Sequence, residues 1–282
     1  MANDNPWPDL ERDLRFYPSH CVNPHHLSQE QIVFYNQNGY LKGFRIFNED
    51  EVIANRSYFD WLLANLEPGK NSYSINGYHK TCHAIYDLVK NPLILEYVQG
   101  VLGPNFVCWG THYFCKLAGD GKAVSWHQDA HYWPLTPSKT VTVWLAVDDA
   151  DVENACMQFI PGSHLNGELK HSASQPSENN VLYRTAEATE IRAEPVHIEL
   201  KAGEISLHSD LLLHRSPPNN SNRRRCGLTM RYASTDVIAH KGWNQNGILC
   251  CGVDADGNWA DIPRPEADES QPLKGQESFK GY

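Results

Sequence analysis

Residues 125–135 read SWHQDAHYWPL, a stretch in which a single residue separates His127 from Asp129. If this stretch is a β-strand, both side chains point to the same face, because alternate residues of a strand share a face. One remote histidine, His214, would complete a set of two histidines and one carboxylate. Such a set binds Fe(II) and leaves coordination positions open for a co-substrate and dioxygen. A lone His-x-Asp occurs often by chance, so the rest of the chain has to support this interpretation.

The second informative stretch is residues 203–232, GEISLHSDLLLHRSPPNNSNRRRCGLTMRY. Residues 205–214 are apolar enough for a strand, residues 217–221 are strong turn formers, and a second strand follows. A hairpin around this turn would set His214 opposite Arg225, and opposed residues share a face. A guanidinium near the metal suits the distal carboxylate of 2-oxoglutarate, which it can bind bidentately. The alternative, a solvated basic turn that includes Arg225, stays open here.

A second His-x-Asp pair, His208 and Asp210, shares the strand parity of His214. Local geometry alone does not exclude these three residues as the ligand set. Along a single strand, however, seven residues at about 3.3 Å each extend over roughly 20 Å, which one metal ion does not bridge. We therefore expect His208 and Asp210 to be strand residues beside the site.

Helical patterns come first in the chain, and short apolar runs separated by turn residues follow. A capping-box pattern at Ser28 begins a helix that ends at Gly39, and further helices are expected at about 48–66 and 84–99. The expected strands are 40–46, 106–116, 124–131, 140–147, 156–160, 196–200, 205–214 and 225–235. This order predicts a mainly β fold with flanking helices, built on a double-stranded β-helix core of the jelly-roll, cupin-like kind.

We expect one domain over residues 1–282, with a helical part at about 27–100 and a β-helix core at about 106–240. An insertion rich in Ser, Glu and Asn, at about 166–194, is expected to form a lid that faces the substrate. The tail at about 261–282 is expected to be loosely ordered.

Charge and composition narrow the range of partners. The formal net charge of −10 argues against nucleic acid and anionic membranes, and weakly against a polyanionic CoA thioester. No apolar stretch is long enough to span a bilayer, and no secretory signal pattern is visible. The eight cysteines form no CxxC pair, and free thiols are typical of a reducing compartment, so we expect a cytoplasmic protein. The sequence leaves the oligomeric state undetermined.

Five segments carry a resemblance to a known family. They are LSQEQIVFYNQNGYLKG (27–43), HQDAHYWPLTPSK (127–139), VTVWLAVDDAD (141–151), FIPGSH (159–164) and the block from His214 to Tyr232. In order and spacing they resemble the phytanoyl-CoA dioxygenase family of Fe(II)/2-oxoglutarate-dependent oxygenases. The resemblance spans roughly residues 27–240, most of the chain.

The resemblance implies roles for six residues. The catalytic metal ligands would be His127, Asp129 and His214, and the 2-oxoglutarate-binding residues would be Arg225, Ser216 and Trp144. One position departs from the family pattern, which usually has glycine after the last histidine, where this chain has Arg215. Either Arg215 points away from the metal or it narrows the pocket.

The resemblance also implies a reaction, in which Fe(II), 2-oxoglutarate and O2 are used to hydroxylate an unactivated C–H bond, with succinate and CO2 as co-products. Asp129 favours hydroxylation, because related halogenases have a small, non-ligating residue there; desaturation and ring formation stay open. The acidic net charge and the aromatic rim of Trp126, Tyr132 and Trp133 favour a small or natural-product-like substrate over phytanoyl-CoA. His131, Tyr132 and Trp133 are the expected substrate contacts.

Two readings from other classes remain. A non-catalytic, cupin-like metal-binding protein would need His127, Asp129 and His214 but not Arg225. A hydrolase would use the same ligands to hold zinc and its bound water. Both leave the arginine block before Cys226 and the long insertion unexplained.

Overall fold

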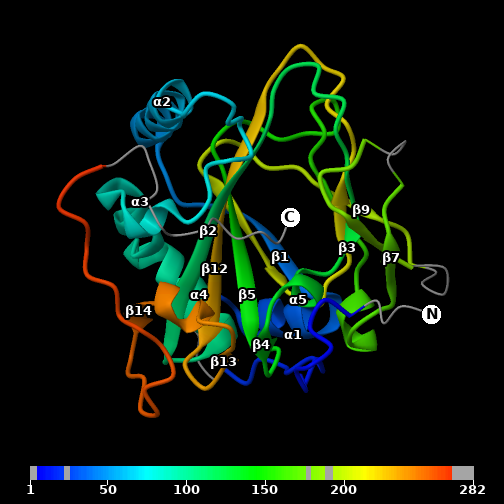
Figure 1. Cartoon of the computed structure of the whole chain (residues 1–282), viewed down its shortest axis with the longest axis vertical. Coiled ribbons are helices and arrows are strands. Elements are labelled where there is room, and N and C mark those ends of the chain that lie inside the picture. The colour runs from blue at the N-terminus through cyan, green and yellow to red at the C-terminus, as the bar shows by residue number, and fades with distance from the viewer. Residues whose placement is uncertain (1–4, 22–25, 176–178, 188–192, 269–282) are drawn as a thin grey trace.

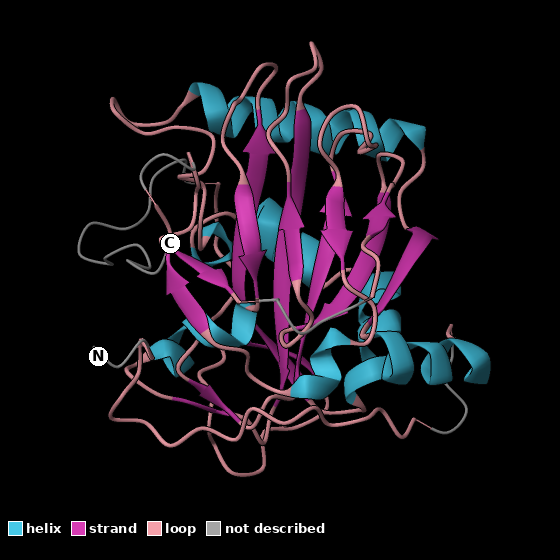
Figure 2. Ribbon diagram, turned by 90° about the vertical axis from the view of Figure 1, so that its right-hand side faces the viewer, coloured by secondary structure: helices cyan, strands magenta, loops and turns pink. Residues whose placement is uncertain are grey.

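Two β-sheets stacked face to face form the body of the protein, and helices cover the outer side of the larger one (Figure 1). The computed structural model describes residues 5–21, 26–175, 179–187 and 193–268. The large sheet has the strand order β1-β10-β5-β12-β2-β14, and the small sheet has the order β3-β11-β6-β9. Viewed after a turn of 90°, the long strands run side by side, with helices around their margin (Figure 2).

The strands of the large sheet are β1 (Tyr40–Arg45), β2 (Phe106–Lys116), β5 (Thr140–Ala146), β10 (Glu204–Ser209), β12 (Arg225–Ser234) and β14 (Ile248–Cys251). The small sheet contains β3 (Val124–His127), β6 (Met157–Phe159), β9 (Val196–Ile198) and β11 (His214–Ser216). Two strand pairs lie outside these sheets: β4 (Leu135–Thr136) with β13 (Ile238–Ala239), and β7 (His171–Ala173) with β8 (Arg184–Ala186). The α-helices are α1 (Gln29–Asn38), α2 (Glu49–Ala64), α3 (His83–Val89), α4 (Pro92–Leu102) and α5 (Asp129–Tyr132). This arrangement confirms the predicted mainly β fold with flanking helices and a double-stranded β-helix core.

Strand β5 shows how the large sheet separates the core from the interior space between the sheets. Val141, Val143 and Leu145 belong to the hydrophobic core that also contains residues of the flanking helices. The alternate residues Thr142 and Trp144 point the other way and line an internal cavity. This alternation follows from the two-residue period of a strand, and it gives the large sheet one apolar face and one functional face.

The N-terminal helices begin where capping patterns predict. Ser28 and Asn48 each accept a hydrogen bond from the backbone N–H three residues on, and the side chains of Gln31 and Glu51 return the contact. The single helix expected at 84–99 is wrong, because two helices occupy this stretch. Proline cannot continue a helix from the residues before it, and here Asn91 caps α4, whose first residue is Pro92.

The strand expected at 124–131 is also wrong in its second half. Strand β3 ends at His127, and Asp129 begins the short helix α5. Gln128 causes the change in direction: its buried side chain donates to the carbonyl oxygens of Gly167 and Leu211, at 2.9 and 2.7 Å. Its Oε1 also accepts a hydrogen bond from the backbone N–H of Leu169. His127 and Asp129 therefore converge through a turn and not through strand parity.

The strand expected at 205–214 is two strands in two different sheets. Strand β10 ends at Ser209, and β11 begins at His214, so residues 210–213 cross from the large sheet to the small one. The predicted hairpin register is wrong for the same reason. His214 pairs with His127 and Phe159, whereas Arg225 pairs with Lys116.

The predicted insertion at 166–194 carries the β7–β8 pair at the side of the small sheet (Figure 1). Residues 176–178 and 188–192 of that insertion, and residues 269–282 of the predicted loose tail, lie outside the described residues. Within the described part of the chain, no helix is long and apolar enough to cross a membrane.

Candidate metal centre and co-substrate cavity

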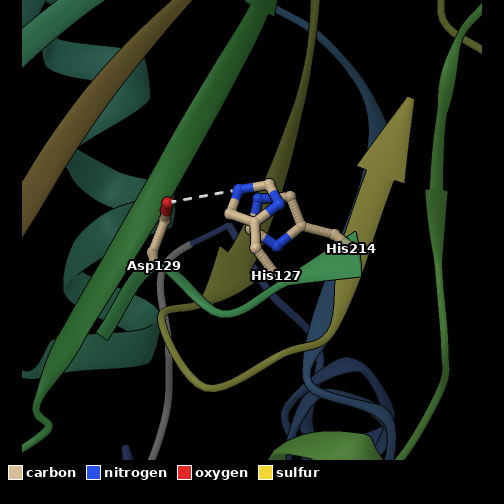
Figure 3. A group of neighbouring side chains, drawn as sticks. All are labelled: His127, Asp129 and His214. Carbon is tan, nitrogen blue, oxygen red and sulfur yellow. Dashed lines mark ion pairs between the residues drawn. The ribbon is translucent and has the colours of Figure 1, made fainter. Parts of the chain in front are cut away.

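His127, Asp129 and His214 come together at the inner edge of the small sheet. One ligand atom from each residue lies within 4.8 Å of the other two, and all three residues are buried. His127 and His214 are direct neighbours across β3 and β11, and their ring centroids are 3.9 Å apart. Their side chains and that of Asp129 point toward one another (Figure 3). This is the arrangement of donor atoms that a divalent cation needs.

The backbone fixes how both imidazoles are oriented. His127 Nδ1 lies 2.9 Å from the carbonyl oxygen of Ser125, and His214 Nδ1 lies 2.9 Å from that of Leu212. A carbonyl oxygen only accepts, so each Nδ1 carries the proton and each Nε2 keeps a free lone pair. A hydrogen bond from the second ring nitrogen is the usual support of a metal-binding histidine. The donor set therefore fits Fe(II).

The carboxylate of Asp129 is held by its neighbours in the large sheet. Its Oδ2 accepts a hydrogen bond from Thr142 Oγ1 at 3.1 Å, and its Oδ1 lies 3.8 Å from His127 Nε2. Burial, and then the neighbouring His214, keep the pKa of His127 well below its usual value. A neutral imidazole beside a carboxylate is the form in which a histidine binds a metal.

His208 and Asp210 lie beside this group, as expected, but not because they share one strand with His214. His208 Nε2 is 3.8 Å from Asp129 Oδ2, and the His208 ring centroid is 4.8 Å from that of His214. Asp210 turns away and accepts a hydrogen bond from Ser138 Oγ at 2.6 Å. Burial raises the pKa of Asp210 to about 6.

Arg225 lies further along the inner face of the large sheet. It is 1% exposed, and its Nη2 donates to Ser216 Oγ at 3.1 Å. The guanidinium carbon lies 5.7 Å from the centroid of the Trp144 ring. Arg225 thus contacts the two residues that the sequence associates with it. Ser216, and not His214, is its partner from β11.

One cavity, lined mostly by buried residues, connects the three potential metal ligands with Arg225. The predicted residues that line it are His127, Asp129, His214, Arg225, Ser216 and Trp144. The sequence did not single out several other lining residues, which include Tyr73, Val124, Met157, Thr229 and Arg231. Strand parity could have found Thr229 and Arg231, since both alternate with Arg225 along β12. Tyr73 comes from a loop outside the sheets and has no such signal.

The three expected substrate contacts occupy a different position. His131, Tyr132 and Trp133 are each at most 3% exposed, and the residues that line the cavity do not include them. His131 stacks on His171 with ring centroids 3.8 Å apart, and the Tyr132 hydroxyl donates to the carbonyl oxygen of Arg184. These residues pack behind the turn that carries Asp129, and their contact with a substrate stays a prediction.

Arg215 points away from the metal ligands. It shares a face of the small sheet with its cross-strand neighbour Gln158, whose Oε1 accepts a hydrogen bond from Arg215 Nε at 2.7 Å. Its guanidinium carbon lies 4.5 Å from the centroid of the Trp126 ring. The guanidinium therefore bonds away from the metal ligands, as in the first of the two readings, although Arg215 is also among the residues that line the cavity. The guanidinium is engaged on the outer face of the sheet.

The other arginines of the basic block are structural. Arg223 forms ion pairs with Asp151 and Glu153, at 2.9 and 2.8 Å. Arg224 pairs with Asp148 at 2.7 Å and also contacts Asp60. Only the third arginine of the block, Arg225, faces the cavity.

Comparison with known proteins agrees with this geometry. The sequence model of the family described as "Phytanoyl-CoA dioxygenase (PhyH)" matches residues 35–227, more than half of the chain. The chain belongs to this family. The PhyH family consists of Fe(II)/2-oxoglutarate-dependent oxygenases, so the expected metal and co-substrate are confirmed at the level of the family.

The chain is also similar to one curated relative and to two solved structures. "Phytanoyl-CoA dioxygenase, peroxisomal" of Rattus norvegicus is 28% identical over 251 residues, which cover 79% of this chain and 73% of that protein. The non-heme monooxygenase ThoJ has a TM-score of 0.71 at 24% identity, over 84% of this chain and 88% of ThoJ. The epimerase SnoN, in complex with Fe3+, alpha ketoglutarate and nogalamycin RO, has a TM-score of 0.64 at 20% identity, over 84% of this chain and 93% of SnoN. At these identities the two structures establish the fold alone.

Proposed function

We propose that this PhyH protein is a hydroxylase that inserts oxygen into an unactivated C–H bond of a small, natural-product-like molecule. The observation that carries the proposal is one cavity with three converging ligand atoms at one end and a buried guanidinium at the other. When bound there, Fe(II) with 2-oxoglutarate and O2 supplies the oxidising power, and succinate and CO2 are the co-products.

At the metal end, His127, Asp129 and His214 are the proposed ligands. The two histidines would bind through Nε2, because each Nδ1–H donates to a backbone carbonyl. Thr142 keeps the Asp129 carboxylate turned toward them. Three protein ligands leave room for the co-substrate and dioxygen, which is the requirement of this chemistry.

At the other end, Arg225 is the proposed contact for the distal carboxylate of 2-oxoglutarate. Its Nε has no hydrogen-bond partner among the described residues, although it is buried. A buried donor without a partner is unfavourable, so an incoming carboxylate would be bound strongly. Ser216 and Trp144 would position the guanidinium and limit the space beside it. This contact distinguishes the proposal from a non-catalytic metal-binding jelly roll and from a zinc hydrolase.

The substrate is proposed to be small and largely apolar where it reacts. Val124 and Met157 add apolar side chains to the lining of the cavity. The net charge of −10 opposes a polyanionic substrate at long range. The presence of a natural product in the SnoN complex supports the same class.

The test is a screen for substrate-stimulated succinate release. Purified protein with added Fe(II) and 2-oxoglutarate would be incubated under air with a library of amino acids, terpenoids, alkaloids and acyl-CoA thioesters. We expect a small molecule to stimulate succinate release and to gain 16 mass units. The His127→Ala variant is the control, and succinate release that persists in this variant would contradict the proposal.

Hydroxylation of an acyl-CoA is the second candidate, and family membership together with the rat relative favours it. The same screen separates the two, because phytanoyl-CoA would then be the best substrate. A product lighter by two mass units would indicate desaturation or ring formation, and a chlorinated product would contradict an oxygenation reaction.

We also propose that the protein acts on its small-molecule substrate in a reducing compartment such as the cytoplasm. None of the eight cysteines forms a disulfide in the described part of the chain, and five of them are buried. Fractionation of cells that express the tagged full chain would test the location, and recovery in an oxidising compartment would contradict it.

A further inference from the structure

A second buried cation lies next to Arg225. Lys116 is the last residue of β2 and is directly opposite Arg225, the first residue of β12. Directly opposed residues of an antiparallel pair share a face of the sheet. Both side chains line the cavity, and each is 1% exposed. Two basic side chains are therefore buried side by side at the end of the cavity away from the metal ligands.

Neutral oxygens are the partners of both cations among the described residues. Lys116 Nζ donates to the carbonyl oxygen of Lys122. Arg225 donates to the carbonyl oxygen of Phe114 at 3.5 Å and to Ser216 Oγ at 3.1 Å. Neither side chain forms an ion pair within the part of the chain that the structure describes. Burying two unpaired cations is unfavourable, and an anion between them would remove much of that penalty.

The nearby carboxylate, Asp120, is already engaged. Its Oδ2 accepts a hydrogen bond from the Tyr73 hydroxyl at 2.8 Å, and its Oδ1 accepts one from the backbone N–H of Lys122. The Lys122 ammonium lies nearby, 5.5 Å from the centroid of the Tyr73 ring, and Arg215 and Arg231 also line the cavity. Asp120 stays outside the residues that line the cavity, whereas Tyr73 lines it. Lys116, Arg225 and the hydroxyl-bearing residues Tyr73 and Ser216 thus line this end of the cavity.

We propose that Lys116 is a second cationic contact for the distal carboxylate of 2-oxoglutarate, which it grips together with Arg225. The assignment rests on the proposed function, in which this carboxylate lies at Arg225. A carboxylate has two oxygens with several lone pairs, so it can accept from the guanidinium and from the ammonium at once.

The proposal has a consequence for protons. Burial, and then the charge of Arg225, lower the pKa of Lys116 to about 7, against a smaller opposing effect of Asp120. Near neutral pH Lys116 is therefore only partly protonated before the co-substrate binds. A bound carboxylate favours the ammonium form and raises this pKa, so binding takes up a proton. The affinity for 2-oxoglutarate should then fall as pH rises above about 7.

The structural alternative is that Lys116 only braces the loop through Lys122. Equilibrium binding under argon separates the two roles without turnover. The Fe(II)-loaded enzyme would be titrated with 2-oxoglutarate and, separately, with 2-oxobutyrate, which lacks the distal carboxylate. Calorimetry in buffers of different ionisation enthalpy would count the protons taken up.

For Lys116→Met we expect the Kd for 2-oxoglutarate to rise about tenfold or more, the loss of one charge-assisted hydrogen bond, with no change for 2-oxobutyrate. At pH 8 the wild type should take up protons on binding 2-oxoglutarate and Lys116→Met should not. Lys116→Arg should retain most of the affinity without the proton uptake, because a guanidinium stays charged. Lys80→Met is the matched control: Lys80 is also partly buried, with a pKa lowered by burial, but it binds Asn246 away from the cavity.

Equal weakening of both 2-oxo acids would mean damage to the loop, and would overturn the assignment. So would an unchanged Kd and proton uptake in Lys116→Met. If the wild type itself bound no 2-oxoglutarate, the proposed function would fail, and that result is distinct from a failure confined to the Lys116 variant.

Discussion

The two ends of the cavity are built in different ways. At the metal end, His127 and His214 belong to short strands of the small sheet, and Asp129 follows a turn. Each of these side chains is oriented by a hydrogen bond to the backbone or to a hydroxyl. At the carboxylate end, Arg225 and Lys116 belong to long central strands of the large sheet, and their positions follow from strand register.

Because the two ends are built differently, we expect them to respond differently to amino-acid substitutions. The metal end depends on three individual side chains, whose loss removes a ligand but leaves the large sheet intact. The carboxylate end depends on packing within the sheet, because Trp144 and Gly227 contact each other beside Arg225. Substitutions at the metal end should therefore affect iron binding first, and substitutions at the carboxylate end should affect 2-oxoglutarate affinity and stability.

The largest effect is expected at the metal end. His127→Ala, Asp129→Ala and His214→Ala should each abolish turnover and weaken Fe(II) retention by more than the roughly 10–100-fold that is typical of outer-sphere substitutions. Iron content after dialysis, measured by atomic absorption, checks this. His208→Ala is the matched control, since His208 lies beside Asp129 but outside the ligand group, and it should retain iron. Full activity in any ligand variant would show that the wrong set has been chosen.

Arg225→Ala should have the next largest effect, on co-substrate binding and not on iron binding. Loss of a bidentate, charge-assisted contact corresponds to about 2–3 kcal/mol, so the Kd for 2-oxoglutarate should rise roughly 30–150-fold while iron stays bound. Binding titration under argon measures this. Arg223→Ala removes an arginine of the same block that pairs with Asp151 at the surface, and should leave the Kd unchanged. An unchanged Kd in Arg225→Ala would remove Arg225 from its assigned role.

Gly227→Ala tests whether packing supports the carboxylate end. A β-carbon at this position would lie 1.9 Å from Cζ2 of Trp144, so the indole has to move. Overpacking of this kind lowers the free energy of unfolding by about 1–3 kcal/mol. We expect a lower Tm and weaker 2-oxoglutarate binding, with iron binding retained. Gly121→Ala, where the nearest atom is the flexible Asn179 amide at 3.4 Å, should change neither.

Asp210→Asn concerns the crossing between the two sheets and should have the smallest effect. Burial raises the pKa of Asp210 from 3.8 to about 6. The folded state binds this proton more tightly, so Asp210 lowers the free energy of unfolding as pH rises from about 4 to about 6, and that loss persists at higher pH. The Asn variant should therefore be more stable at pH 8, by on the order of 1–2 kcal/mol.

Chemical denaturation at several pH values measures the effect of Asp210→Asn. The control is Asp236→Asn, whose exposed carboxylate pairs with Lys139 and should contribute little. Lower stability of Asp210→Asn at pH 8 would contradict the account.

The sequence named the residues of the metal end for a structural reason that the fold does not bear out. His127, Asp129 and His214 were named from spacing and family resemblance, yet the expected shared strand does not exist. The buried side chain of Gln128 turns the chain after His127, and a contact between residues 128 and 211 is not visible in local periodicity. The candidate residues were therefore accessible from the motif, and the turn that brings them together was not.

For the carboxylate end, the sequence named two residues but predicted their arrangement in the sheets wrongly. Arg225 and Ser216 were named, but a hairpin was assumed where the chain changes sheets between residues 216 and 225. The apolar run at 205–214 reads as one strand because periodicity does not mark a crossing between two sheets. Lys116 could be placed opposite Arg225 only once the pairing of β2 with β12 was known.

The most direct test of the central claim is 2-oxoglutarate turnover across both ends of the cavity. Succinate would be measured for the wild type, His214→Ala and Arg225→Ala under air with Fe(II), over a wide range of 2-oxoglutarate concentrations. We predict succinate release by the wild type, none by His214→Ala at any concentration, and recovery of Arg225→Ala at high 2-oxoglutarate. Equal succinate release by all three proteins, or none by the wild type with any compound of the library, would contradict the account.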